Sequence, residues 1–237
     1  VLALQTSGDG VRAGCILNTG YAGRDERSLW SLEPNGEWRG PLAENVQRFL
    51  WHPTEACMIA LVARDDLPTG ASRPVCDLVR VWPDGRNDPL DPGQRYSDAI
   101  LVATGKDVLA LTAGGNLRAL STDGEESRDL EVGGAPVLDA LYLGEERVAV
   151  LLGPYQKSTG ETSTGQLVLF NLAEGEQSSV SPVAPKGTLW TGGRILGNHA
   201  PTGYLFLRLW QRDPQAGRVV MVNQNGGPVQ EISLATK

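Results

Sequence analysis

Short apolar runs that end in tight turns recur along the whole chain. Asn-Gly and Asp-Gly dipeptides between apolar runs are a strong hairpin signal, and we expect type I′ turns with positive φ at both central residues. The final glycines are 49, 39, 51 and 51 residues apart. The runs are SLWSLEPNG (28–36), LVRVWPDG (78–85), LRALSTDG (117–124), LVLFNLAEG (167–175) and RVVMVNQNG (218–226).

Two more apolar segments precede each run, and a short strand follows each turn. No segment of 11 or more residues has a clear 3.6-residue period, so the pattern predicts strands throughout. Each unit then has four antiparallel strands. The second segments are VRAGCIL (11–17), CMIALVA (57–63), DVLALTA (107–113), RVAVLLG (147–153) and GYLFLRLW (203–210), and the first are VLALQT (1–6), RFLWHP (48–53), DAILVATG (98–105), VLDALYLG (137–144) and GRILG (193–197).

Four-stranded units of 40–50 residues that repeat in this way are typical of β-propeller blades. A single blade leaves two apolar faces uncovered, and stacking against neighbouring blades buries both. We therefore predict an all-β fold, a five-bladed β-propeller of four-stranded antiparallel blades in a single domain, 1–237. The alternatives are a β-sandwich, or part of a larger propeller. The approximate blades are 1–44, 45–93, 94–133, 134–184 and 185–237.

Composition and charge exclude several classes of function. The net charge is −7 and no Lys/Arg cluster occurs, which disfavours nucleic acid as a partner. No apolar run approaches the roughly 20 residues that span a bilayer, so membrane insertion is not expected. The three cysteines, Cys15, Cys57 and Cys76, are interpreted as core thiols, with a Cys57–Cys76 disulfide as an alternative.

Residues 51–90 resemble the TolB-like propeller repeat. The similarity rests on Trp51-His52-Pro53, an apolar strand that ends at Arg64-Asp65, a strand that ends at Asp84-Gly85, and the closing Pro89-Leu90. His52 stands where that repeat has a small polar residue. The resemblance implies a propeller that binds proteins, peptides or glycans, often in the periplasm or outside the cell. It implies no catalytic residues.

Residues that suggest chemistry are scattered along the predicted strands. His52 and His199 are the only histidines and fall in different units. We see no cysteine or carboxylate cluster beside them, so no metal site and no cofactor are expected. Cys57 opens an apolar strand, which is a packing context, so no His52–Cys57 catalytic pair is expected. We expect the stretch 49–66 to be spread along a blade, with His52 and Arg64 at opposite ends of one strand.

A carbohydrate-active propeller, either a lectin or a glycoside hydrolase, is the alternative function. Such hydrolases use paired carboxylates in the central channel. Asp98 and Asp139 lie near innermost strands, but they are out of register by one residue, which turns them to different faces. Trp38 is the best candidate for an exposed, sugar-stacking tryptophan.

The loop between the second and third strands varies in length from one unit to the next more than any other loop does. Longer loops occur at 19–28, 64–74, 154–165 and 211–217, whereas the third unit has only Gly114-Gly115-Asn116. Equivalent loops of a propeller emerge on one rim, where binding residues concentrate. The sequence therefore predicts a non-catalytic module that binds a protein or peptide partner, with a glycan as an alternative ligand. The candidate binding residues are Tyr21, Arg24, Arg27, Arg64, Asp65, Tyr155, Lys157 and Arg212.

Overall fold

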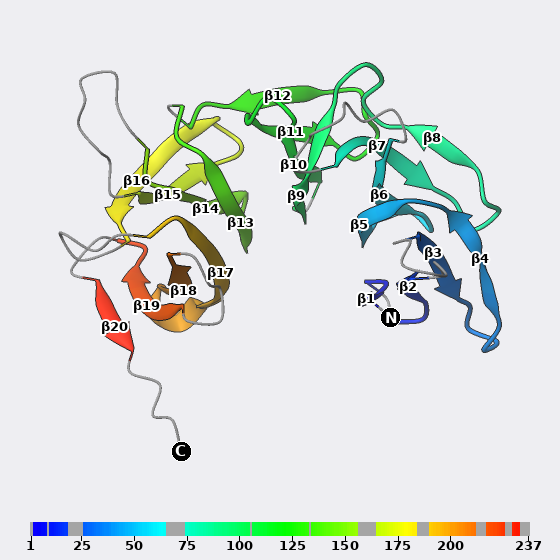
Figure 1. Cartoon of the computed structure of the whole chain (residues 1–237), viewed down its shortest axis with the longest axis horizontal. Coiled ribbons are helices and arrows are strands. Elements are labelled where there is room, and N and C mark those ends of the chain that lie inside the picture. The colour runs from blue at the N-terminus through cyan, green and yellow to red at the C-terminus, as the bar shows by residue number, and fades with distance from the viewer. Residues whose placement is uncertain are drawn as a thin grey trace. The chain divides into compact units, whose positions relative to one another are not determined.

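The computed structural model divides into two compact units, Val1–Asp129 and Leu130–Lys237 (Figure 1). It is all-β, and within the described residues no helix is long and apolar enough to cross a membrane. The described residues are 2–8, 10–18, 26–64, 74–104, 106–132, 134–155, 165–183, 190–211, 217–225 and 229–232.

The first unit holds three repeats of four antiparallel strands. Strands β1 to β4 form one sheet, and β5 to β8 join β9 to β12 in a larger sheet where β7 pairs with β9 at Val75 and Cys76. The strands are β1 (Ala3–Thr6), β2 (Ala13–Asn18), β3 (Arg27–Leu32) and β4 (Trp38–Ala43) in repeat 1; β5 (Val46–Trp51), β6 (Met58–Ala63), β7 (Val75–Val81) and β8 (Asn87–Pro89) in repeat 2; and β9 (Tyr96–Ala103), β10 (Asp107–Thr112), β11 (Leu117–Ser121) and β12 (Ser127–Leu130) in repeat 3.

The second unit holds two more sheets of the same kind. Both are antiparallel and follow the chain order, β13-β14-β15-β16 and β17-β18-β19-β20. A single 3-10 turn, Ala200–Thr202, separates β17 from β18. The strands are β13 (Val137–Gly144), β14 (Arg147–Leu152), β15 (Gln166–Asn171) and β16 (Glu176–Pro182) in repeat 4, and β17 (Gly192–His199), β18 (Tyr204–Trp210), β19 (Arg218–Asn223) and β20 (Gln230–Ile232) in repeat 5.

The turns that end at Gly36, Gly85 and Gly124 form hairpins, but the geometry predicted for them is wrong. Gly36, Gly85 and Gly124 have φ of 84°, 86° and 81°, whereas the Asn or Asp before each of them is not among the residues with positive φ. The amide of Gly36 donates to the carbonyl of Glu33, and the amide of Glu33 donates to the carbonyl of Glu37. This is a type I turn closed by a left-handed glycine, which needs positive φ at one residue instead of two.

The core lies between neighbouring sheets. Ile16 and Leu29 of repeat 1 pack with Phe49 and Met58 of repeat 2, and all four side chains are at most 4% exposed. A second cluster joins repeat 2 to repeat 3, and a third joins repeats 4 and 5. Burying one such side chain contributes roughly 1.5–3 kcal/mol, so stacking of the repeats supplies most of the stability.

Several side-chain predictions can be compared with this core. Cys15, Cys57 and Cys76 are buried free thiols, so the alternative Cys57–Cys76 disulfide is wrong. Trp38 is 52% exposed, which confirms its exposure but not a role in sugar binding.

Candidate functional site

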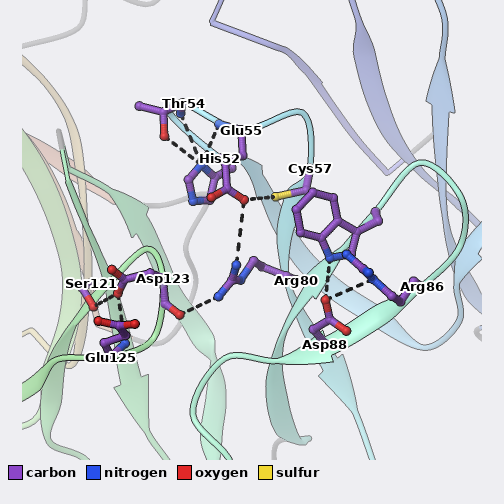
Figure 2. A network of polar contacts seen from close by, with 11 residues as sticks. His52, Thr54, Glu55, Cys57, Arg80, Arg86, Asp88, Ser121, Asp123 and Glu125 are labelled. Carbon is purple, nitrogen blue, oxygen red and sulfur yellow. Dashed lines mark hydrogen bonds and ion pairs between the residues drawn. The ribbon is translucent and has the colours of Figure 1, made fainter.

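One polar network gathers at the edge of the first unit where strands are joined by short turns. We call this edge the turn edge, and we call the network the turn-edge cluster: His52, Glu55, Cys57, Arg80 and Asp123 (Figure 2). His52 follows β5, Cys57 precedes β6, Arg80 lies in β7, and Asp123 lies in the turn between β11 and β12. The cluster therefore links repeat 2 to repeat 3.

His52 acts as the hydrogen-bond acceptor of its own turn. Its Nδ1 accepts the backbone N–H groups of Thr54 at 3.2 Å and Glu55 at 2.9 Å. A nitrogen that accepts two N–H groups carries no proton, so the neutral ring holds its proton on Nε2. The side chain is buried, and Nε2 has no hydrogen-bond partner in the described part of the chain.

Cys57 is held in its neutral thiol form. Its side chain is fully buried, and Sγ donates to Glu55 Oε2 at 3.8 Å. Burial, with a smaller contribution from the nearby negative charge of Glu55, raises the pKa of Cys57 to about 12. Because the thiolate is the nucleophilic form, this environment opposes nucleophilic chemistry at neutral pH.

Arg80 connects the two repeats of the cluster. Its Nη1 lies 3.8 Å from Glu55 Oε2, and its Nη2 donates to the backbone carbonyl of Asp123 at 2.5 Å. The Arg80 side chain is 19% exposed, so the charge is largely removed from water and its partners matter for stability.

His52, Glu55 and Cys57 could be read as a metal site, since their ligand atoms lie within 4.8 Å of one another. A metal-bound histidine normally donates its second ring N–H to an acceptor. Here the second nitrogen, Nδ1, faces two N–H donors, which opposes metal binding through Nε2. The arrangement therefore fits a capped turn better than a metal centre.

The proximity of these residues was not predicted from the sequence. His52 lies before β6 and Arg64 directly after it, so these two residues lie at opposite ends of one strand, as expected. The expectation that no cysteine or carboxylate clusters beside a histidine is wrong for His52, because the turn brings Glu55 and Cys57 close to it. The five-residue interval from His52 to Cys57, with Pro53 inside it, was a signal for such a turn. Nothing local in the sequence pointed to Arg80, which joins the cluster through strand pairing.

The opposite edge of the first unit is the long-loop edge, where β2, β6 and β10 end and β3, β7 and β11 begin. Arg64 Nη1 lies 3.4 Å from Asp77 Oδ2, and Arg95 Nη1 lies 3.1 Å from Asp77 Oδ1. Arg27 Nη1 donates to Gln47 Oε1 at 2.8 Å, which bridges repeats 1 and 2. Polar contacts at this edge thus span all three repeats of the unit.

Only three of the predicted binding residues are described by the structure. Arg27 and Arg64 lie at the long-loop edge of the first unit, and Tyr155 follows β14 in the second unit with its side chain half-buried. Asp77 and Arg95 were not among the predicted residues, although Arg95 donates a hydrogen bond to Asp77 at this edge. The remaining candidates lie outside the described residues: Tyr21, Arg24, Asp65, Lys157 and Arg212.

The two carboxylates considered for glycoside hydrolysis have different surroundings. Asp139 Oδ2 accepts the backbone N–H of Ile195 at 2.7 Å, so it joins β13 to β17. Asp98 lies in β9, and its backbone carbonyl accepts a hydrogen bond from Arg48 Nε at 2.5 Å. The Asp139 carboxylate is thus engaged in a structural bond between repeats.

Comparison with solved structures identifies the architecture. A puromycin hydrolase matches with a TM-score of 0.60 and 17% identity, over 97% of this chain and 36% of the hydrolase. BamB from Moraxella catarrhalis matches with a TM-score of 0.52 and 14% identity, over 98% of this chain and 63% of BamB. Both contain β-propellers. The chain has a propeller-like all-β fold.

These similarities support the assignment of the fold alone. The chain spans about a third of the hydrolase and less than two thirds of BamB. A puromycin hydrolase variant complexed with PGG matches equally well, at a TM-score of 0.60 and 16% identity. No protein-family model and no curated protein sequence matches the chain. The TolB-like resemblance of residues 51–90 therefore stays a prediction.

Proposed function

We propose that the chain is a non-catalytic β-propeller module of five blades, one for each repeat, that binds a protein or peptide partner at its long-loop edge. Such a module would serve as a domain or subunit of a larger assembly. The observation that supports this proposal most is the ordered polar edge of the first unit, formed by Arg27, Gln47, Arg64, Asp77 and Arg95.

The charged side chains of this edge are suited to binding a protein or peptide partner. Asp77 is shared by two guanidinium groups, and the side chains of Arg64, Asp77 and Arg95 are 32%, 39% and 39% exposed. Partly exposed arginines that are already held in place lose little conformational entropy on binding. Arginine and tyrosine are also enriched among residues that dominate binding energy. In the turn-edge cluster, by contrast, His52 and Cys57 are buried.

Affinity capture from the native source tests the proposal. The test variant carries Arg27→Ala, Arg64→Ala and Arg95→Ala, all at the long-loop edge of the first unit. The control carries Glu37→Ala, Arg39→Ala and Arg86→Ala, which lie at or near the turn edge. We expect a partner retained by the wild type and the control, with an affinity for the test variant that is about tenfold weaker or more.

The proposal is wrong if the test variant retains every specific partner at wild-type affinity. It is equally wrong if the control variant loses the partner and the test variant keeps it, because binding would then occur at the turn edge. Circular dichroism of both variants checks that they remain folded.

A further inference from the structure

Arg95 is the last residue of the loop between β8 and β9, and this loop is held at several points. The hydroxyl of Tyr96, whose side chain is fully buried, donates to Asp91 Oδ2 at 2.5 Å. Arg118 Nε lies 3.2 Å from the same carboxylate oxygen. The backbone carbonyl of Arg95 accepts the N–H of Ala113 at 2.8 Å, which fastens the loop to the end of β10. The backbone at Arg95 is therefore fixed in the free chain.

The Arg95 side chain uses only one of its nitrogens within the first unit. Nη1 donates to Asp77 Oδ1 and to the backbone carbonyl of Gln94, each at 3.1 Å. Nε and Nη2 have no hydrogen-bond partner in the described part of the chain, and both reach the protein surface. Nη1 is the nitrogen on the Cδ side of the guanidinium, so the unused edge is the one on which the Nε–H and an Nη2–H lie parallel.

Arg118 shows how an arginine of the same unit is used when its role is structural. Its Nε lies 3.2 Å from Asp91 Oδ2, its Nη1 bonds to Asp129 Oδ1 at 3.0 Å, and its Nη2 donates to Ser127 Oγ at 2.8 Å. Every nitrogen of that guanidinium is thus occupied. Arg95 differs because it is held by one nitrogen and keeps a charged edge open.

The open edge of Arg95 has the geometry of a carboxylate-binding fork. Two parallel N–H groups of a guanidinium match the two oxygens of a carboxylate, and such charge-assisted pairs are among the strongest hydrogen bonds in proteins. The bond from Nη1 to Asp77 already limits the motion of the side chain. A ligand therefore gains two hydrogen bonds while little conformational entropy is lost.

The local charge favours a carboxylate over a phosphate group. Arg64 and Arg95 share the carboxylate of Asp77, so two positive charges and one negative charge sum to +1 in these three side chains. One carboxylate neutralises this charge, whereas a phosphate group with a charge of about −1.5 to −2 exceeds it. The net charge of the chain is −7, which opposes any general attraction of anions. An acidic ligand therefore needs a specific site of this kind.

We propose that Arg95 anchors the partner at the long-loop edge by binding one of its carboxylates through Nε and Nη2. The carboxylate belongs to an aspartate or glutamate side chain or to the C-terminus of a peptide. This inference rests on the proposed function, because it takes the long-loop edge as the place where a protein or peptide binds. It adds the chemical group that the partner presents there.

Peptide libraries with defined anionic groups test this inference. Short peptides carry Glu, Gln or phosphoserine at one central position, have an amidated C-terminus, and are random elsewhere without Asp or Glu. A fourth library has Gln at the central position and a free C-terminal carboxylate. The tightest peptide of each library is measured by fluorescence anisotropy against the wild type, Arg95→Ala and Arg95→Lys. The control is Arg86→Ala, which removes a 57% exposed arginine near the turn edge.

We expect the tightest peptide to come from the Glu library or from the library with a free C-terminus, and the library that supplies it identifies the source of the carboxylate. Its affinity should fall at least about tenfold in Arg95→Ala. Arg95→Lys should also weaken binding, because lysine keeps the charge but lacks the fork. The Arg86→Ala control should bind as the wild type does.

Tightest binding by an amidated Gln peptide or by a phosphoserine peptide would overturn the inference. An unchanged affinity in Arg95→Ala, or an affinity fully kept by Arg95→Lys, would do the same. If a peptide binds Arg95→Ala normally but is lost by a variant with Arg27→Ala and Arg64→Ala, the inference fails and the proposed function stands. If no library yields a binder, or if binding survives all three substitutions together, the proposed function fails as well.

Discussion

At the scale of single residues, hydrogen-bond direction decides the meaning of the turn-edge cluster. The same three side chains, His52, Glu55 and Cys57, could be a metal site, a catalytic pair or a turn. The two backbone N–H groups that point at His52 Nδ1 fix the tautomer, and the buried Cys57 stays a thiol. The residues are reactive in type, but their surroundings favour a structural role.

Substitution of His52 tests this interpretation. His52→Ala should lower the free energy of unfolding by about 1–2 kcal/mol, because two backbone N–H groups lose their acceptor. His52→Asn should cost less, since an asparagine side chain can accept N–H groups from the residues that follow it. Urea titration measures both. Added zinc should not raise the Tm of the wild type, and zinc stabilisation that disappears in His52→Ala would establish a metal site instead.

The buried thiols predict an alkaline loss of stability. Burial raises the pKa of both Cys57 and Cys76 to about 12, while an unfolded cysteine titrates near 8.5. Between these values the unfolded chain has lost protons that the folded chain keeps, so stability is full below about pH 8.5 and falls as pH rises toward 12. Cys57→Ala should show a shallower fall than the wild type in urea unfolding from pH 8 to 10.5. Parallel curves would mean that Cys57 has no raised pKa.

Sequence alone could identify these residues but not their arrangement. Residue types and spacing marked His52 and Cys57, and the predicted burial of the cysteines is confirmed. The direction of each hydrogen bond depends on the turn that closes between β5 and β6. The contact of Arg80 with Asp123 depends on the packing of repeat 3 beside repeat 2, over a separation of 43 residues.

At the scale of elements, periodicity predicted most strands to within a few residues. The segment predicted at 137–144 coincides with β13, and 147–153 corresponds to β14 at Arg147–Leu152. Apolar alternation succeeds here because the sheets are buried on their faces. The turns were harder to predict, since Asn-Gly and Asp-Gly suit both a type I′ turn and a type I turn closed by glycine.

Gly14 tests how closely the first two sheets pack. A Cβ at this position would lie 2.7 Å from Phe49 Cε2 and 2.8 Å from Met58 Sδ. Gly14→Ala should therefore lower the free energy of unfolding by about 1–3 kcal/mol through overpacking. Gly8→Ala is the matched control, because a Cβ there meets no atom within 4 Å. Equal stabilities of the two variants in urea titration would show that repeats 1 and 2 are not packed this closely.

At the scale of the whole molecule, the repeat predicted the propeller-like fold before any comparison with known structures. Stacked four-stranded antiparallel sheets follow from a strand pattern that recurs every 40–50 residues, and solved propellers match nearly the full length of the chain. The number of blades does not follow from the repeat pattern alone, because it depends on how successive sheets are inclined. The partner does not follow either, because loop length marks a surface without specifying its ligand.

If the long-loop edge, and not the turn-edge cluster, is the binding surface, a bound partner should shield its backbone amides from exchange. Hydrogen–deuterium exchange of the chain with and without its captured partner measures this. We expect protection on binding in peptides that cover 19–28 and 64–77, with unchanged exchange at 52–57 and 121–126. Protection confined to 52–57 and 121–126 would contradict it.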